Sequence, residues 1–173
     1  MRYYRIISYL LVFFLITSAI AFIPFQKAIV FKPNHSDEKY AYILVKNEAY
    51  FQIKYTHSIH LSPVIESYKI TPDYHVQQYE LMYEDFAIGM PANAEEGETF
   101  VQKDGVYTIK NMKRDFPFFH LRIGQVRANH TVIFKNREYP LSQTIKPGTS
   151  VKVEIRKLNF LSQWKGVNIL ESI

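Results

Sequence analysis

Apolar and polar side chains alternate along much of this 173-residue chain, and this alternation limits the possible folds more than any other feature. The pattern is cleanest in residues 151–156, where three β-branched side chains alternate with three charged ones. Successive side chains of a strand point to opposite faces, so a repeat of two indicates strands with one buried face. The 13 Tyr and 13 Phe favour the same structure, because aromatic side chains pack well on sheets.

Turn sequences separate the alternating segments. Asp104-Gly105 favours a tight hairpin, and Pro147-Gly148 favours a type II turn. Strands at short spacing, joined by such turns, are typical of antiparallel folds. We therefore predict an all-β domain, a small antiparallel sandwich or partly open barrel of seven to ten strands.

The domain is expected to span residues 40–173. Residues 40–46 and 49–57 flank an Asn-Glu turn and predict a first hairpin. The apolar side chains after residue 158 favour a short C-terminal helix that closes the β core. Residues 24–39 contain Pro33 among polar residues and are interpreted as an extended linker.

An uncharged apolar run at residues 6–23 follows Arg2 and Arg5. About 20 such residues suffice to cross a bilayer as a helix, and flanking arginines tend to stay in the cytoplasm. Residues 1–23 are thus a signal or anchor helix that places the β domain outside the cytoplasm. We favour an uncleaved single-pass anchor, with secretion after cleavage at Ala21 as the alternative.

Composition excludes several classes of protein. The chain has no cysteine, so disulfides, thiolate metal sites and cysteine nucleophiles are excluded. The net charge of +5 is spread along the chain without the basic stripe that a nucleic-acid-binding protein needs, so we expect no nucleic-acid partner. No cofactor motif is present, and none is predicted.

The densest polar stretch is residues 55–66, with the sequence YTHSIHLSPVIE. It lies between two segments that otherwise have the pattern of strands. Continuing the alternation places His57 and Glu66 on the apolar face and Ser58 on the opposite face. With His57 opposite Val64, His57 and Glu66 become diagonal neighbours within reach of each other, and Tyr55 lies opposite Glu66.

Four interpretations of this stretch remain open. His57, His60 and Glu66 are weak candidates for metal ligands, since their spacing matches no helical metal motif. A serine nucleophile at Ser58 is disfavoured because adjacent Ser and His point to opposite faces. The favoured interpretations are a structural His57–Glu66 pair that locks the hairpin and a ligand site in which Ser58, His60 and Ser62 contribute from the loop.

A second candidate region follows residue 84. Gly89 and Pro91 stop regular structure there and are candidates for a binding loop. The acidic residues 95–98 come next, and a solvated loop explains them better than a cation site does. We therefore predict no metal centre and no catalytic residue.

The chain resembles a family of small exported bacterial proteins classed as a domain of unknown function. The residues that carry the resemblance are Tyr55-Thr56-His57-Ser58, Pro63-Val64-x-Glu66, Glu84-Asp85-Phe86-x-Ile88-Gly89-Met90-Pro91, Phe116-Pro117 and Leu121-Arg122-Ile123-Gly124. The similarity extends over residues 40–157. Members of this family are often encoded beside the permease and solute receptor of TAXI-type TRAP transporters. The resemblance implies an all-β extracytoplasmic domain and a link to solute uptake.

The sequence therefore predicts a membrane-tethered accessory or binding module outside the cytoplasm. Its expected partners are the membrane, a transporter or solute-receptor protein, and a small solute. A metal-dependent or serine hydrolase that uses His57, Ser58, His60 and Glu66 is the alternative from another class. A purely structural envelope protein is the third.

Overall fold

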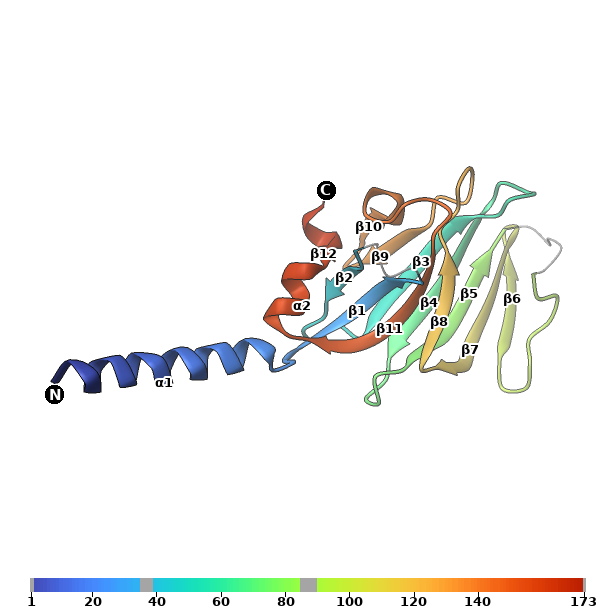
Figure 1. Ribbon diagram of the computed structural model, residues 1–173. Helices are drawn as coiled ribbons and strands as arrows, with labels where there is room; N and C mark the ends of the chain where they lie inside the picture. The colour runs from blue at the N-terminus through green and yellow to red at the C-terminus, as the bar shows by residue number, and fades with distance from the viewer. Residues whose placement is uncertain (1, 35–38, 85–89, 173) are drawn as a thin grey trace.

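The computed structural model describes residues 2–34, 39–84 and 90–172, with twelve strands in these ranges (Figure 1). The strands form two separate sheets, so the protein is an all-β sandwich preceded by an N-terminal helix. The predicted fold class is confirmed, and of the two predicted forms the structure has the sandwich.

The five-stranded sheet is built from both ends of the β domain. Its order is β12-β2-β1-β11-β8, with β1 and β11 at its centre paired antiparallel along their length. β12 joins β2 in parallel, and the other pairs are antiparallel. Its strands are β1 (Gln26–Pro33), β2 (Ala41–Leu44), β8 (Phe118–Arg122), β11 (Ser150–Leu158) and β12 (Val167–Asn168).

The seven-stranded sheet contains the middle of the chain, in the order β10-β9-β3-β4-β5-β7-β6. All of its neighbouring strands are antiparallel. Its strands are β3 (Tyr50–Thr56), β4 (Pro63–Ile70), β5 (Val76–Tyr83), β6 (Thr99–Lys103), β7 (Val106–Phe116), β9 (Thr131–Phe134) and β10 (Arg137–Pro140).

The main core lies between the two sheets. Alternate side chains of β1 and β11 meet those of β3, β4 and β9, as in Phe31, Val153, Ile53 and Val132, which are almost fully buried. A smaller cluster around Val64, with Leu81, Tyr83, Ile109 and Met112, covers the part of the large sheet formed by β4, β5 and β7. β4 contributes both to the main core and to this satellite cluster. A third cluster in the described residues, on the other face of the five-stranded sheet, contains Ala28, Val30, Tyr42 and Leu158.

Two expectations about the N-terminal half of the domain are wrong. Half of the proposed linker is β1, whose residues Ala28–Phe31 are buried in the five-stranded sheet. The proposed first hairpin does not form, since β2 belongs to the five-stranded sheet and β3 to the seven-stranded sheet. Local alternation revealed the strands but could not show that the connection between them crosses from one sheet to the other.

The predicted turns agree better with the structure. Asp104 and Gly105 both have positive φ and join β6 to β7, as a tight hairpin requires. Gly148 has a φ of 90° in the turn before β11. Pro117 is the corner at which the chain leaves β7 and enters β8 in the other sheet.

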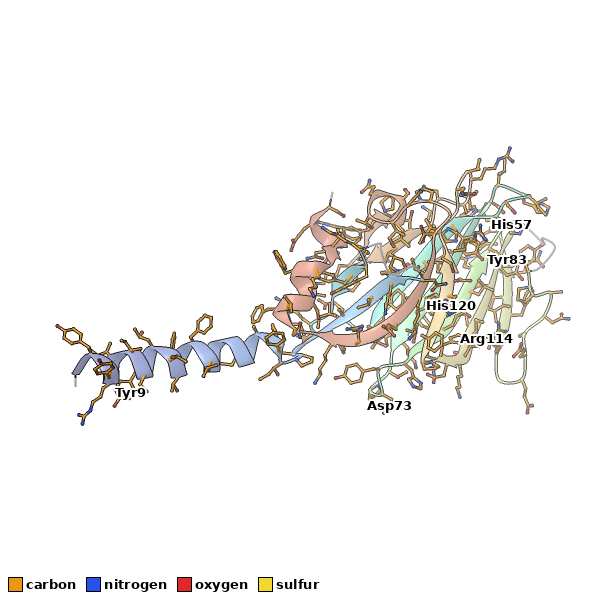
Figure 2. All side chains as sticks on the ribbon, viewed as in Figure 1. Tyr9, His57, Asp73, Tyr83, Arg114 and His120 are labelled. Atoms are coloured by element: carbon orange, nitrogen blue, oxygen red, sulfur yellow. The ribbon has the colours of Figure 1, made fainter. Side chains whose placement is uncertain are left out.

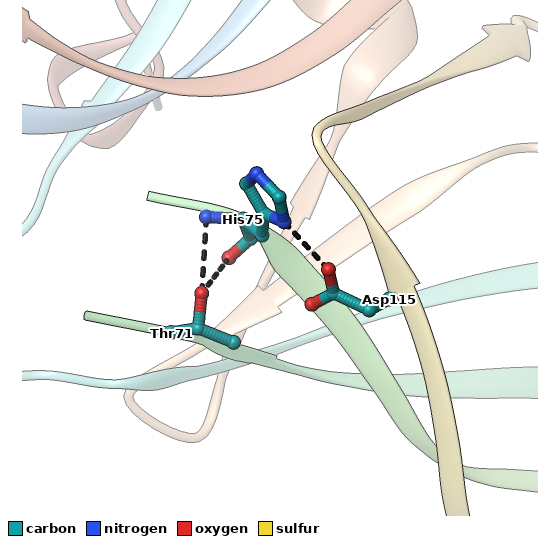
Figure 3. A network of polar contacts seen from close by, with 3 residues as sticks. All are labelled: Thr71, His75 and Asp115. Atoms are coloured by element: carbon teal, nitrogen blue, oxygen red, sulfur yellow. Dashed lines mark hydrogen bonds and ion pairs between the residues drawn. The ribbon is translucent and has the colours of Figure 1, made fainter. Parts of the chain in front are cut away.

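The turn between β4 and β5 is closed by a small polar network (Figure 3). The His75 backbone N–H donates to the Thr71 hydroxyl at 3.1 Å, and the His75 ring Nδ1 lies 2.5 Å from the Asp115 carboxylate of β7. The side chains of His75 and Asp115 are exposed to solvent. The network thus fastens the β4–β5 turn to β7 at the surface.

Helix α1 (Arg2–Phe22) projects from the β domain beside the short helix α2 (Phe160–Lys165) (Figure 1). Within the described residues, its segment Tyr3–Phe22 is long and apolar enough to cross a membrane. These properties fit both a membrane anchor and a signal sequence. Two short 3₁₀ turns, Leu141–Gln143 and Ile169–Glu171, complete the fold.

Candidate functional site

The polar stretch between β3 and β4 forms a hairpin loop at one end of the large sheet, where Figure 2 labels His57. The His57 backbone N–H donates to the Ser62 carbonyl at 2.9 Å, and the Leu61 N–H donates to the His57 carbonyl at 3.0 Å. The His57 ring Nδ1 accepts two long contacts, from the N–H groups of Ile59 at 3.4 Å and His60 at 3.5 Å. The imidazole of His57 thus accepts hydrogen bonds from the backbone of its own loop.

The other loop candidates do not converge on one point. Ser58 and His60 are exposed, whereas Ser62 is buried. The rings of His57 and His60 lie 5.7 Å apart, and Glu66 lies four residues into β4. Among the described residues, no group of three or more potential metal ligands comes together. The weak metal set of His57, His60 and Glu66 is therefore not assembled, and nothing in the geometry favours the hydrolase.

The predicted His57–Glu66 pair is wrong because the register differs by two residues. Tyr55, rather than His57, lies opposite Val64, and Ile53 lies opposite Glu66. A shift of two residues leaves every side chain on its predicted face. Glu66 therefore points into the sandwich as predicted, but its partners are not the predicted one.

The Glu66 carboxylate is held by two tyrosines. The Tyr68 hydroxyl donates to Glu66 Oε2 at 2.7 Å, and the Tyr55 hydroxyl also hydrogen-bonds to this carboxylate. Tyr55 lies on the neighbouring strand, diagonal to Glu66, and Tyr68 follows two residues along β4 on the same face. The alternation of β3 and β4 thus builds a carboxylate with two hydroxyl donors on the inner face of the large sheet.

Stacked rings fix the two tyrosines. Tyr68 lies between Phe51 and Phe119, with ring centroids 5.2 Å away on both sides. Tyr55 stacks on His130, also at 5.2 Å. Because Phe119 belongs to β8 of the other sheet, the stack connects the two layers beside the carboxylate.

Burial shifts the pKa values of the ionisable groups in this cluster. It raises the pKa of the Glu66 carboxyl group, although the two tyrosine hydrogen bonds oppose the shift. Burial and the nearby Glu66 charge raise the pKa values of Tyr55 and Tyr68, so both hydroxyls stay protonated as donors. Burial lowers the pKa of His130, which keeps its ring neutral at neutral pH, and its Nδ1 accepts from the Gly124 N–H at 3.1 Å.

The cluster opens into a pocket of about 370 Å³ between the inner face of the large sheet and β8, here called the Glu66 pocket. Its walls are largely aromatic, with polar groups at a few positions. The lining residues are Tyr55, Glu66, Tyr68, Gln78, Phe116, Phe119, His120, Leu121, Arg122 and His130.

A β-bulge brings Gln78 into this pocket. The β4–β5 register shifts so that Glu80 pairs with Ser67 but Gln78 pairs with Tyr68, leaving Tyr79 as the extra residue. Such an insertion turns the following side chains to the other face. Gln78 is therefore buried beside Tyr68 and lines the pocket.

Two other hollows are weaker candidates. A larger one of about 460 Å³ lies at the edge of β3 and β9, but several of its lining residues are exposed and its Glu48 carboxylate is paired with Lys135 at 2.5 Å. The acidic loop forms the second, where Arg114 pairs with Glu95 at 3.0 Å and with Glu98 at 3.5 Å. The Glu48, Glu95 and Glu98 carboxylates of these hollows are thus already paired with basic side chains of the protein.

The remaining loop candidates are Gly89 and Pro91. Gly89 falls in residues 85–89, outside the described part of the chain. The Pro91 carbonyl accepts a hydrogen bond from the hydroxyl of Tyr83, which is buried in the satellite cluster. Pro91 therefore ties its loop to the large sheet, and the structure shows a packing contact for it.

Comparison with known proteins places the chain in a family. A family model described as a domain of unknown function, DUF1850, matches residues 51–141, more than half of the chain. The chain belongs to the DUF1850 family. The expected family of unknown function is thus confirmed, over a shorter range than the predicted 40–157. Neither curated proteins nor solved structures gave a match to this chain.

The DUF1850 match contains the whole Glu66 pocket. It runs from β3 to the 3₁₀ turn after β10, so it includes the seven-stranded sheet and β8. The strands β1, β2 and β11, which complete the sandwich, lie outside it. The family-matched segment therefore supplies the residues of the pocket, while the flanking segments supply most of the second sheet.

Sequence reasoning identified Glu66 but not most of its neighbours. Tyr55 and Tyr68 share its face by simple alternation, and the predicted register already placed Tyr55 beside Glu66, although opposite it instead of diagonal. Gln78 faces inward only because of a bulge, and His130 directly precedes β9, which is distant in the sequence. Neither leaves a signal in the local sequence.

Proposed function

We propose that this chain is a membrane-tethered binding module outside the cytoplasm, and that the Glu66 pocket holds its ligand, a small organic solute. One observation carries the proposal: a half-buried carboxyl group, fixed by two tyrosine hydroxyls, opens into a pocket with aromatic walls. Apolar walls with a few placed polar groups, in a cavity of 300–1,000 Å³, are typical of small-molecule sites.

The position of Gln78 supports a ligand in this place. Its side chain adds a polar group, able both to donate and to accept hydrogen bonds, to a pocket with largely aromatic walls. Gln78 lies opposite Tyr68 and lines the same pocket as Glu66. A solute that exchanges hydrogen bonds with Gln78 and Glu66 while its apolar part contacts the rings would satisfy both groups.

The setting of the module follows from the N-terminus and the family. An uncleaved α1 with Arg2 and Arg5 on the cytoplasmic side would hold the β domain at the outer surface of the membrane. The resemblance to proteins encoded beside TRAP-type transporters favours an accessory role in solute uptake. The partner would then be the permease or its solute receptor, and its presence after gentle co-purification from native membranes tests this part of the proposal.

Because the pKa of Glu66 is raised, the pH dependence of binding would differ between two classes of solute. A cationic amine would favour the ionised carboxylate, so its affinity would rise with pH through the titration of Glu66. A carboxylic acid would need the protonated form as a donor, and its affinity would fall over the same range. The pH dependence of binding therefore reports the charge of the ligand.

Thermal unfolding of the full chain in detergent tests binding, with panels of amino acids, dicarboxylic acids and primary amines. A ligand at 100 times its Kd stabilises the folded state by about 2.7 kcal/mol. We expect a shift in Tm that is lost in Glu66→Gln and Gln78→Leu and kept in the loop control Ser58→Ala, whose side chain is exposed. A shift that survives both pocket substitutions, or no shift across the panels, contradicts the proposal.

A further inference from the structure

The short helix α2 presents two aromatic side chains to solvent. Phe160 is 57% exposed and Trp164 is 80% exposed. They lie four residues apart, so they share one side of the helix. Tryptophan is a highly buried residue on average, and a side chain this exposed next to another exposed ring indicates a surface that something covers.

This aromatic surface begins where α1 ends. The Asn159 side chain caps α2 by accepting from the Ser162 N–H at 2.7 Å, and it donates to the Phe22 carbonyl, in the last turn of α1, at 2.9 Å. The ring of Phe25 packs against that of Phe160 at 4.6 Å. α2 is thereby fixed at the level where a membrane-spanning α1 would leave the hydrocarbon, as its place in Figure 1 shows.

Three lysines lie at the same end of the domain as the exposed rings. Lys27 and Lys157 lie directly opposite each other on β1 and β11, on the face of the sheet away from α2, and Lys165 is in the last turn of α2. In the described part of the chain, none of the three forms an ion pair, and the Lys157 ammonium lies 5.9 Å from the Tyr74 ring. Like charges directly opposite on paired strands destabilise a sheet, and an anionic surface nearby would offset this repulsion.

We propose that Phe25, Phe160 and Trp164, with Lys27, Lys157 and Lys165, form a membrane-docking patch that seats the β domain on the lipid headgroups around α1. The rings enter the interface, where tryptophan is favoured, and the lysines contact anionic phospholipid headgroups. The inference rests on the proposed membrane tether and adds that the domain has a fixed orientation on the membrane instead of swinging about residues 23–25.

The chain carries its own probe for this contact, because Trp164 is its one tryptophan. The full chain is incorporated into vesicles of phosphatidylcholine and phosphatidylglycerol, with and without brominated phosphatidylcholine, and separated by flotation. We expect the protein to float with the vesicles and its tryptophan emission to be blue-shifted and quenched by the brominated lipid. A floating protein with unquenched, water-like emission overturns the docking patch and leaves the tether intact.

Two variants provide matched controls. Trp164→Phe combined with Val126→Trp moves the probe to a side chain that is 89% exposed in the loop between β8 and β9, at the end of the domain away from α1, and its emission should not be quenched. Lys27→Gln with Lys157→Gln should weaken quenching of Trp164 in vesicles that contain phosphatidylglycerol, and change it little in pure phosphatidylcholine.

Three other outcomes would also contradict the docking patch. A protein that does not float overturns both the tether and the patch. A blue shift that depends on protein density and resists brominated lipid means that a second copy covers the rings, which overturns lipid docking. Equal quenching at positions 164 and 126 would mean that the whole domain contacts lipid without a preferred side.

Discussion

The hairpin loop of residues 57–62 and the Glu66 pocket are the two polar regions of the β domain, and they differ in how their polar groups are satisfied. The loop is rich in polar side chains along the sequence, yet His57 contacts its own backbone and Ser58 and His60 face solvent. The pocket draws single polar residues from several strands and encloses them among aromatic rings. Density of polar residues in the sequence is therefore a poorer guide to a site than burial of a few of them.

Removing the ring of Tyr68, in the pocket, should have the largest effect on the free energy of unfolding. Tyr68→Ala deletes a buried ring stacked between Phe51 and Phe119, so we expect a loss of about 3–5 kcal/mol in the free energy of unfolding, measured by denaturant titration. Tyr50→Ala, at a ring 60% exposed on the same sheet, is the control and should cost far less. Equal losses would mean that the pocket wall contributes no more than a surface ring.

Removing only the Tyr68 hydroxyl isolates its bond to Glu66. Tyr68→Phe keeps the stack and leaves the half-buried carboxylate with one donor fewer, which should cost about 1–3 kcal/mol. The cost should shrink in a Glu66→Leu background, where no acceptor remains. A double-mutant cycle with no coupling would show that the hydrogen bond is not formed in solution.

The pH dependence of stability tests the pocket side of the comparison. Because the folded-state pKa of Glu66 is raised, the folded protein binds more protons than the unfolded chain above the ordinary carboxyl range. Stability contributed at this site is therefore present at low pH and lost as pH rises towards the folded pKa. The unfolding free energy of wild type minus that of Glu66→Gln should fall over that window, while the loop substitution Ser58→Ala, which removes no ionisable group, should leave the pH dependence of wild type unchanged.

His130 affects this measurement in the opposite direction. Its lowered pKa means that the folded state binds fewer protons, so stability rises as pH approaches the ordinary histidine value. The contribution is common to wild type and Glu66→Gln and cancels in their difference. A difference that rises with pH would place the Glu66 carboxylate beside a cation, and a difference independent of pH would place it in solvent; either result would remove the basis of the pocket.

The smallest effects are expected in the loop. Ser58→Ala and His60→Ala remove exposed side chains and should change stability by no more than about 0.5 kcal/mol. His57→Ala and Glu66→Ala should add within about 0.5 kcal/mol, because the two side chains have different partners. Strong coupling between them would restore the pair predicted from the sequence.

Alternation and turn chemistry account for what was predictable. They located β3, β4, β6, β7 and β11 and the inward face of Glu66, because these depend on neighbours along the chain. The pairing of β1 with β11 and the corner at Pro117 depend on contacts between distant segments, and no local pattern encodes them. The same limit applies to the pocket. The predicted register of β3 and β4 was wrong by two residues, and the sequence indicated neither the bulge at Tyr79 nor the position of His130 in the pocket.

The central position of β1 has a consequence for export. β1 directly follows α1, and its neighbour β11 lies near the other end of the chain. During translocation β1 would reach the outer surface first and wait there, largely apolar, until almost the whole protein had crossed. Under the proposed export, closure of the sandwich would be tied to the last stage of translocation, and a chain arrested before β11 would expose an unpaired strand to proteases and to other unfinished copies.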